Sequence, residues 1–373
     1  MVMRLAVDAR VLSHRPTGVA RYLRGLLGAM VPQLAPGEQV ELWSDGPIED
    51  PPGGLEVRPL RWLLPGGDPA WRQIRLAVAA GRRRPDLLFC PFYSVPLLAR
   101  VPRVVTVHDV SFAAHPEWFR RRARVAFSLA GPSARRARAV LTPSHFSAGE
   151  IEQRLGVPRE KIHVTPLGVE ANWSDEVGAA ERRALRKWLG WEGPYLLHLG
   201  AVHLRRHVDV TVEAFARLAT ARPELRLVVA GPDQPPAPDL AGLAARLGVA
   251  GRVQRRPWVP GEHLRGLVAE ARALVYLSDY EGFGLPALEA MACGTPVVAL
   301  RRASLPEVLG EAAVWADRPD AEQVATVTAH LLDDELLAAR LARAGRGRAR
   351  DFTWQACARR TLAVLRRAAR LEV

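Results

Sequence analysis

Short apolar runs alternate with helix-forming segments along the chain, and this rhythm constrains the fold more than any other feature. The runs are continuous rather than alternating in polarity, and they include RLAVDA, DLLFC, RVVTVHD, YLLHLG, LRLVVAG and ALVYLS. Strands that are buried on both faces have this pattern, and such strands belong to parallel sheets that helices cover on both sides. We therefore predict an α/β protein built on doubly wound parallel sheets.

The alternation pauses between Ala171 and Pro194 and then begins again. A chain of 373 residues also exceeds one ordinary hydrophobic core. We expect two Rossmann-like domains, at residues 1–170 and 171–354, followed by a basic helix at residues 355–373.

The cysteines and the apolar runs indicate the compartment. Cys90, Cys293 and Cys357 are odd in number and have no Cys-x-x-Cys spacing, so neither disulfides nor a zinc site is indicated. No uncharged apolar run approaches the roughly 20 residues of a membrane-spanning helix. The first residues enter a strand pattern that contains Asp8, unlike a signal peptide. We expect a cytoplasmic protein.

The formal net charge of +13 is mostly arginine, because the sequence contains two lysines. The first 170 residues carry 24 basic against 15 acidic side chains, and the remainder carries 28 against 24. The excess is concentrated in three clusters, at Arg82–Arg84, Arg120–Arg124 and Arg135–Arg138. Clustered arginine attracts polyanions such as RNA, an anionic bilayer or a pyrophosphate-linked lipid, whereas solvated helix faces are the alternative explanation.

The strongest local signal is the stretch from Ser278 to Leu300, SDYEGFGLPALEAMACGTPVVAL. Glu281 follows an apolar run and precedes two glycines, and Glu289 stands eight residues later in a helix-forming run. Turns between a strand and a helix lie at the carboxyl edge of a parallel sheet, where ligands bind. Glycine lets the amides of a helix N-terminus approach an anion. Two carboxylates beside an anion cradle suit a ligand with both hydroxyl and phosphate groups.

Other polar residues also stand directly after apolar runs. Thr17 can cap a helix, and Gly18 lets a phosphate or a sugar approach its amides. His108 suits either a buried structural position or hydroxyl recognition by imidazole. The pair Arg205–Arg206 opens a helix, where the dipole disfavours cations, so an anionic partner is expected.

These motifs resemble those of retaining glycosyltransferases of family 4. The resemblance rests on EGFGLPALEAMACGTPVV with the downstream LPEV, on TG-V-x-R-Y and on HD, and it is strongest from Tyr195 to Glu311. It implies the GT-B fold, in which two Rossmann-like doubly wound domains face each other across a cleft. It also implies that the last helix crosses back onto the first domain. The first domain would bind the acceptor and the second the nucleotide-sugar.

The resemblance assigns roles to matching positions. Glu281 would bind the sugar hydroxyls and Glu289 the ribose diol. His108 would lie against the donor sugar, with Asp109 as its orienting neighbour, and Gly18 would lie near the donor phosphates.

The remaining donor contacts follow in the same way. Arg205 and Arg206 would neutralise the diphosphate, although this chain has LRRH where the family has P-R-K-N. Gly200 would form the glycine turn after its strand. Backbone amides would complete the phosphate site at Gly282, Phe283, Gly284 and Leu285.

Aromatic residues leave several interpretations open. Val259, in RRPWV, resembles the loop that touches the nucleotide base through its backbone, and the adjacent Trp258 fits either the core or a stacking platform. Tyr93 is an exposed-loop candidate on the acceptor side. Trp118 and Phe119 stand beside arginines as in interfacial membrane helices, with an ordinary domain helix as the alternative.

The resulting hypothesis is a retaining hexosyltransferase of cell-surface polysaccharide synthesis, similar to bacterial mannosyltransferases and rhamnosyltransferases. GDP-mannose is the leading donor, UDP- and dTDP-sugars stay open, and the acceptor is a glycan or a lipid-linked saccharide. No Asp-x-Asp follows a strand, so neither an essential metal nor another cofactor is expected. Peripheral contact of the basic first domain with the inner face of an anionic membrane is a further hypothesis, and nucleic acid is not an expected partner.

Three alternatives remain. A nucleotide-sugar epimerase shares the GT-B fold, and it would consume donor without an acceptor. A phosphorylase would need a pyridoxal lysine, for which Lys161 and Lys187 are the only candidates. A basic nucleic-acid-binding protein would show steeply salt-dependent affinity and indifference to replacement of Glu281.

Overall fold

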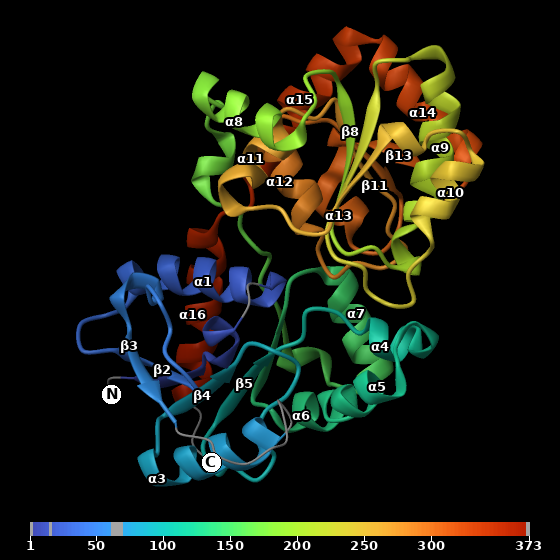
Figure 1. The fold of residues 1–373 in the computed structure, drawn as a ribbon. Coiled ribbons are helices and arrows are strands. Elements are labelled where there is room, and N and C mark those ends of the chain that lie inside the picture. The colour runs from blue at the N-terminus through green and yellow to red at the C-terminus, as the bar shows by residue number, and fades with distance from the viewer. Residues whose placement is uncertain (1–2, 15–16, 61–69, 371–373) are drawn as a thin grey trace. The chain divides into compact units, whose positions relative to one another are not determined.

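The computed structural model describes residues 3–14, 17–60 and 70–370. It divides into two compact units (Figure 1). Unit 1 comprises the described residues up to Gly168 and from Phe352 onward, and unit 2 runs from Val169 to Asp351. Residues 371–373 of the expected C-terminal helix lie outside the described residues.

Unit 1 is built on a parallel sheet of seven strands within the described residues, in the order β3-β2-β1-β4-β5-β6-β7. The strands are β1 (Arg4–Asp8), β2 (Gln39–Ser44), β3 (Glu56–Pro59), β4 (Leu87–Cys90), β5 (Arg103–Thr106), β6 (Ala139–Thr142) and β7 (Ile162–Val164). Its helices are α1 (Gly18–Met30), α3 (Ala77–Arg83), α4 (Ser111–Ala114), α5 (Arg121–Phe127), α6 (Ala130–Arg136), α7 (His145–Leu155) and α16 (Trp354–Arg370). The helix that precedes β4 begins as a π-helix, η4 (Trp71–Leu76), and continues into α3.

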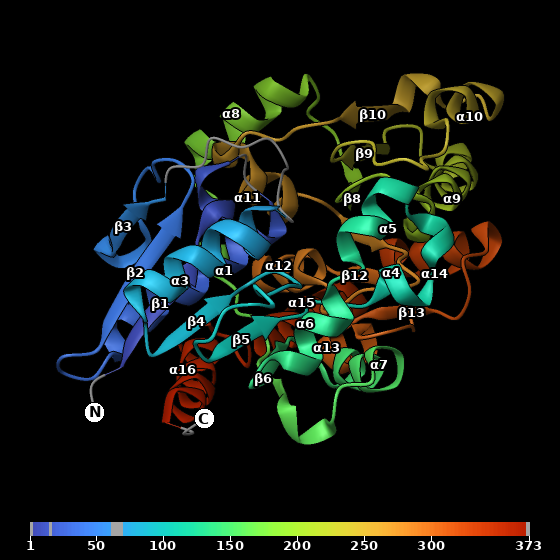
Figure 2. The ribbon, with the colours of Figure 1, turned by 90° about the horizontal axis from the view of Figure 1, so that it is seen from below.

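The C-terminal helix α16 packs beside α1 and along β4, β5 and β6, and Figure 2 shows it next to these strands. Close approach is possible because Gly25 has no side chain: a Cβ there would lie 2.3 Å from the Trp354 ring. Gly168 gives the same chain segment room, since its Cβ would lie 2.1 Å from the Trp354 amide nitrogen. The helix therefore completes the core of unit 1.

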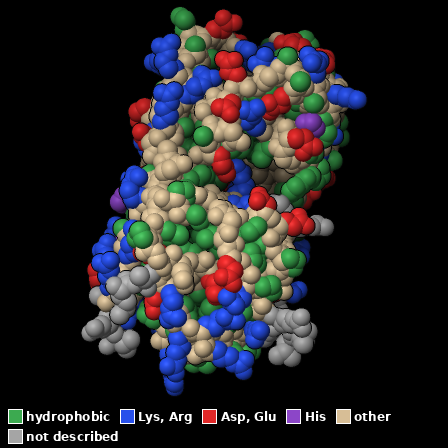
Figure 3. Space-filling view, turned by 90° about the vertical axis from the view of Figure 1, so that its left-hand side faces the viewer, with side chains coloured by type: hydrophobic (Ala, Val, Ile, Leu, Met, Phe, Trp, Pro, Cys, Tyr) green, Lys and Arg blue, Asp and Glu red, His purple; other side chains and the backbone are tan. Residues whose placement is uncertain are grey.

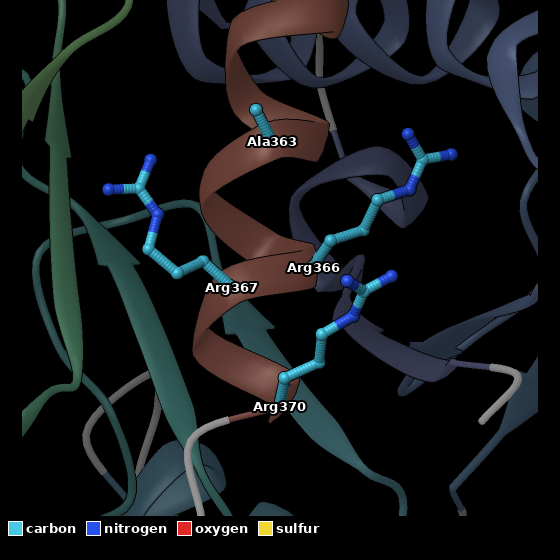
Figure 4. A pocket seen from close by; sticks show the side chains of 4 residues that line it. All are labelled: Ala363, Arg366, Arg367 and Arg370. Carbon is cyan, nitrogen blue, oxygen red and sulfur yellow. The ribbon is translucent and has the colours of Figure 1, made fainter.

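Figure 4 shows a shallow pocket at the end of α16, with Arg366 and Arg370 on one side of the helix and Arg367 on the other. Arg366 donates hydrogen bonds of 2.9 and 2.7 Å to the two carboxylate oxygens of Glu38. Cations are favourable in the last turn of a helix, where the carbonyl dipoles point. Helix electrostatics and one ion pair thus account for this arginine cluster.

Unit 2 has a parallel sheet of six strands within the described residues, in the order β10-β9-β8-β11-β12-β13. The strands are β8 (Tyr195–Leu199), β9 (Arg226–Ala230), β10 (Val253–Arg256), β11 (Ala273–Tyr276), β12 (Val297–Leu300) and β13 (Val314–Ala316). Its helices are α8 (Ala179–Leu189), α9 (Val208–Ala221), α10 (Leu240–Arg246), α11 (Gly261–Ala269), α12 (Leu285–Cys293), α13 (Leu305–Leu309), α14 (Ala321–Asp333) and α15 (Glu335–Ala349).

The strand orders locate the ligand-binding positions. Both sheets place their first strand between the second and the fourth, which is the order of the doubly wound Rossmann fold and confirms the predicted fold class. In such sheets the order reverses at a switch point, and ligands bind outside the carboxyl ends of the strands that flank it. These strands are β1 and β4 in unit 1 and β8 and β11 in unit 2.

Basic side chains are spread widely over one face of the molecule. On the face shown in Figure 3, Lys and Arg side chains occur from top to bottom, with Asp and Glu among them. This mixture on one face is typical of a solvated surface.

Candidate functional site

In unit 2 the loops after β8 and β11 bring the predicted anion-binding residues together. The first loop contains a short 3-10 helix, η8 (Leu204–Arg206), and the second precedes α12. Glu281 Oε1 lies 2.8 Å from Arg205 Nη1 and 3.1 Å from Arg206 Nη2. Ser278 Oγ donates to the same carboxylate oxygen at 2.9 Å. Two guanidinium groups and one carboxylate therefore form a single cluster at the switch point.

The protonation state of Glu281 follows from this cluster. Burial alone would raise the pKa of Glu281, but Arg205, Arg206 and the Ser278 hydroxyl outweigh it and lower the pKa to about 2. The side chain is a carboxylate at neutral pH, so it accepts hydrogen bonds from hydroxyl groups and cannot act as a proton donor.

Gly200, at the end of β8, provides the space that Arg206 occupies. Its φ of 132° lies in the region that favours glycine, and a Cβ there would be 1.9 Å from Arg206 Nη1. On its other side the Arg206 guanidinium lies over the ring of Tyr276, 5.7 Å from the ring centroid. Arg206 is thus held between backbone and an aromatic ring, and the role expected for Gly200 in donor binding stays a prediction.

The N-terminus of α12 adjoins the cluster. Gly284 precedes the helix with a φ of 95°, and a Cβ there would lie 2.6 Å from Leu305. Amides in the first turn of a helix have no carbonyl partner within the helix, and together they attract anions. Ser304 Oγ donates to the Glu281 carbonyl at 2.8 Å and fixes the turn. The other residues predicted for this cradle lie in the same turn: Gly282, Phe283 and Leu285.

A second ionic network joins the same loops. His207 Nε2 lies 2.5 Å from Asp279 Oδ2, and Arg302 pairs with the other carboxylate oxygen. The Asp279 amide donates to the Arg205 carbonyl at 2.9 Å. Burial raises the pKa of Asp279, but His207 and Arg302 more than offset it and hold the pKa below its usual value. The β8, β11 and β12 loops are therefore tied together through Asp279.

The remaining residues predicted to contact the donor lie in α12 and in the loop after β10. Glu289 is fully buried within α12, and its contact with a ribose stays a prediction. Trp258 is 63% exposed in the loop after β10, so the core alternative for this residue is wrong. The neighbouring Val259 is half-buried, and its contact with a base is likewise a prediction.

In unit 1 the N-terminus of α1 follows β1 and is open to solvent. Thr17 caps it, since Thr17 Oγ1 accepts a hydrogen bond from the Ala20 amide at 3.2 Å. Gly18 is exposed, and among the described residues no atom would lie within 4 Å of a Cβ placed there. This backbone can therefore be approached closely by a ligand group.

His108 stands after β5 in a defined orientation. Its Nε2 lies 2.9 Å from the carbonyl oxygen of Pro91. Because a carbonyl can only accept, Nε2 carries the proton and Nδ1 is the hydrogen-bond acceptor of the neutral ring. The ring packs edge-on against Tyr22, with the centroids 4.8 Å apart, and burial lowers the pKa of His108. The imidazole is therefore neutral at pH 7.

Two acceptor-side predictions require correction. Asp109 was expected to orient His108, but the His108 ring instead donates its hydrogen bond to the Pro91 carbonyl. Asp109 instead accepts from the Ser111 amide at 2.8 Å and from the Tyr93 hydroxyl at 3.1 Å. Tyr93 was expected in an exposed loop, but it is 9% exposed and packs among phenylalanine rings. Its hydroxyl positions Asp109.

A buried ion pair in unit 1 was missed by the sequence analysis. Asp8, at the carboxyl end of β1, accepts hydrogen bonds from Trp71 Nε1 at 3.1 Å and from Arg72 Nε at 3.2 Å. Asp8 is visible in the first strand pattern, whereas its partners, more than 60 residues away, carry no local signal. The supporting residues in unit 2 were missed for the same reason: Ser278, Asp279, Arg302 and Ser304.

No helix among the described residues is both apolar enough and long enough to cross a bilayer. Within the same residues, no group of three or more His, Cys, Asp or Glu side chains is arranged to hold a metal ion.

Two family models match the chain, one for each half. Residues 16–173 match Glycosyltransferase Family 4, and residues 182–348 match Glycosyl transferases group 1. The O-antigen chain mannosyltransferase B of Escherichia coli is 34% identical over 266 residues, which are 69% of this chain and 68% of that protein. The MMP alpha-(1->4)-mannosyltransferase of Mycolicibacterium hassiacum is 34% identical over 286 residues, which are 72% of this chain and 66% of that protein.

Solved structures agree in fold. WaaG, a glycosyltransferase involved in lipopolysaccharide biosynthesis, superposes with a TM-score of 0.76 at 17% identity over 97% of this chain and 99% of its own. HepE of Anabaena in complex with UDP-glucose gives a TM-score of 0.77 at 18% identity over 98% of this chain and 100% of its own. The chain therefore belongs to the family 4, group 1 glycosyltransferases and has the GT-B fold.

Proposed function

We propose that this glycosyltransferase moves a hexose from a nucleotide-sugar to a glycan or lipid-linked acceptor in cell-surface polysaccharide synthesis, with retention of anomeric configuration. The observation that carries the proposal is the cluster of Arg205, Arg206 and Glu281 at the switch point of unit 2. It offers two cations to a diphosphate and one carboxylate to sugar hydroxyls. Unit 2 accordingly binds the donor and unit 1 the acceptor.

The chemistry follows from the charges. As the bond to the anomeric carbon breaks, negative charge grows on the departing diphosphate, and Arg205, Arg206 and the first amides of α12 stabilise it. Arginine suits this task because its guanidinium can engage two phosphate oxygens at once. Glu281, with a pKa of about 2, holds the sugar hydroxyls and donates no proton. The acceptor attacks from the face that the diphosphate leaves, and a phosphate oxygen takes the acceptor proton, which retains the configuration.

Unit 1 offers two substrate-contacting groups of its own in this proposal. His108 accepts a hydrogen bond from a sugar hydroxyl through Nδ1, because Pro91 fixes the proton on Nε2. Gly18 admits a phosphate oxygen to the N-terminus of α1. The reaction needs no metal in this proposal, since charge neutralisation falls to arginine and backbone amides.

GDP-mannose is the proposed donor. The mannosyltransferase names of two relatives support mannose, whereas the UDP-glucose bound to HepE keeps UDP-sugars in the comparison. The test is a panel of GDP-mannose, UDP-glucose and dTDP-rhamnose, with nucleoside diphosphate release measured with and without polysaccharide-derived acceptors. Acceptor-dependent release of GDP supports the proposal. Donor turnover without acceptor would instead indicate the epimerase, and no turnover with any donor would refute the proposal.

A matched pair of variants connects the assay to the site. Arg205→Met removes a cluster cation, and Arg222→Met removes an arginine that pairs with the exposed Asp333. We expect transfer to fall at least a hundredfold in the first variant and to persist in the second, since one charge-stabilising donor contributes about 10²–10³ to the rate. Equal activities would contradict the assigned role of the cluster.

We also propose that unit 1 contacts an anionic membrane through α5. Arg121, Arg122 and Arg124 are exposed on this helix, and Val125 is 65% exposed among them. Each basic side chain near an anionic surface contributes about 1 kcal/mol. Replacing the three arginines by glutamine should abolish sedimentation with phosphatidylglycerol vesicles. The matched triple replacement at Arg340 and Arg343 of α15 and at Arg350, which directly follows it, should leave sedimentation unchanged, and equal losses would argue for non-specific attraction.

A further inference from the structure

Trp258 is a large aromatic side chain that the fold leaves in solvent. It stands between β10 and α11 and is 63% exposed. A single exposed apolar residue is common on protein surfaces and carries no meaning by itself. Its position carries the argument, because the loop after β10 belongs to the same carboxyl edge as the Arg205–Arg206 loop and the Glu281 turn.

The strand order gives the spacing along this edge. β10 lies two strands from β8, and neighbouring strands are about 4.8 Å apart, so the ends of β10 and β8 are about 10 Å apart. The loop also leads directly into α11, which packs against α12. Packed helices have axes about 8–10 Å apart. The loop that contains Trp258 therefore opens a helix that neighbours α12, at the carboxyl edge of the sheet where the cluster lies.

The opposite side of the cluster is already filled. Toward β12, Asp279 is bound by His207 and Arg302, and Ser304 is hydrogen bonded to the Glu281 carbonyl. A nucleotide whose diphosphate occupies the cluster has its nucleoside directed toward β9 and β10.

The loop that presents Trp258 is anchored in advance. Arg255 donates to the carbonyl oxygens of Val229 at 2.8 Å and Gly231 at 3.0 Å. The Gly231 amide donates to the Arg256 carbonyl at 2.8 Å. Pro257 and Pro260 flank the tryptophan and restrict the backbone further. Less backbone freedom is lost when a ligand settles on a loop anchored in this way.

We propose that Trp258 is the stacking platform for the nucleobase of the donor. The inference rests on the proposed function, and it adds a specificity residue that acts through its side chain. Stacking requires a π-face rather than a pattern of donors and acceptors, so it accepts any base. A purine offers the larger face, and Trp258 therefore favours GDP over UDP.

The experiment compares binding of GDP, UDP and inorganic pyrophosphate by calorimetry. Loss of base–aromatic stacking weakens binding roughly 5- to 150-fold. We expect the Kd for GDP to rise by this factor in Trp258→Ala and in Trp258→Leu. Trp258→Phe, which keeps a ring, should retain most of the affinity. Pyrophosphate has no base, so its affinity should stay the same in all variants. Leu247→Ala is the control. Leu247 is also apolar and 38% exposed, but it precedes β10 in the chain and so lies toward the opposite edge of the sheet.

The outcomes separate the two proposals. If the wild-type protein binds GDP and Trp258→Ala binds it equally well, stacking is refuted while the proposed function stands. If GDP and pyrophosphate weaken together, Trp258 supports the loop rather than the base, which also overturns the inference. If the wild-type protein binds none of the nucleotides, the proposed function itself fails and the inference with it.

Discussion

Replacing Glu281 by glutamine removes one negative charge from between two arginines while preserving the shape of the side chain. In the folded protein the pKa of Glu281 falls from its ordinary 4.5 to about 2. Since one pKa unit corresponds to about 1.4 kcal/mol, the charged form is favoured by about 3 kcal/mol. The carboxylate is 12% exposed, so solvent screening is limited. Glu281→Gln should therefore lower the free energy of unfolding by about 3 kcal/mol at pH 7, which leaves a typical protein folded.

The contribution of Glu281 to the free energy of unfolding should decrease as the pH falls. The folded pKa is below the unfolded one, so the unfolded chain binds the proton first as the pH falls. The contribution is complete above about pH 5 and is lost as the pH approaches 2, and less than half remains at pH 3. The stability gap between the wild-type protein and Glu281→Gln should shrink accordingly.

The assay is unfolding in urea, which adds no salt, and it is monitored by circular dichroism at pH 7 and at pH 3. Asp333→Asn is the control, because this carboxylate pairs with Arg222 but is 64% exposed, and such pairs contribute less than about 1 kcal/mol. Glu281→Gln should still bind GDP through both arginines while transfer is lost. A variant as stable as the wild-type protein at pH 7, or a gap of equal size at both pH values, would refute the electrostatic reasoning.

Three further outcomes are expected. Gly200→Ala should weaken GDP binding and cost about 1–3 kcal/mol of stability, because a Cβ at a φ of 132° displaces Arg206. Gly347→Ala, in α15 with no atom within 4 Å of the new Cβ among the described residues, should be neutral or stabilising when both variants are compared by thermal unfolding. His108→Gln can keep a donor to Pro91 but loses Nδ1, so transfer should fall. In the wild-type protein the buried imidazole has to accept a proton as the pH drops below 6.5, which lowers the free energy of unfolding. His108→Gln should remove this loss. An unchanged decrease in stability below pH 6.5, measured by urea unfolding, would contradict the reasoning. Finally, EDTA should leave transfer unchanged after dialysis, and activity that returns only with an added divalent cation would show that the arginines do not suffice.

The chain of apolar runs was sufficient to predict two doubly wound sheets, because continuous hydrophobic strands have few other places to be buried. The cluster in unit 2 was also accessible from sequence. Arg205, Arg206 and Glu281 each stand just after a strand, and parallel topology brings strand ends to one edge whatever the intervening residues are.

The sequence was less informative about burial and partners. Tyr93 follows a strand in the same way as His108, yet it packs among three phenylalanine rings, and Trp258, for which the sequence left a core position open, is exposed. Which side of a turn a side chain faces depends on helices that are distant in sequence. Asp109 shows the same limit, because its partners are set by the turn at Ser111 rather than by its neighbour.

The backbone at His207 indicates how the donor site is held before any ligand arrives. Its φ of 44° is in the left-handed region, which costs a residue with a Cβ roughly 1–2 kcal/mol. The structure tolerates this strain because the same residue bonds Asp279 at 2.5 Å, and Asp279 in turn binds Arg302 and the Arg205 carbonyl. The strained residue thus joins the arginine loop to the glutamate turn. Since Glu281 already holds the two cations within the protein, the diphosphate meets charges in position, and the binding energy of the donor is available for the sugar and the base.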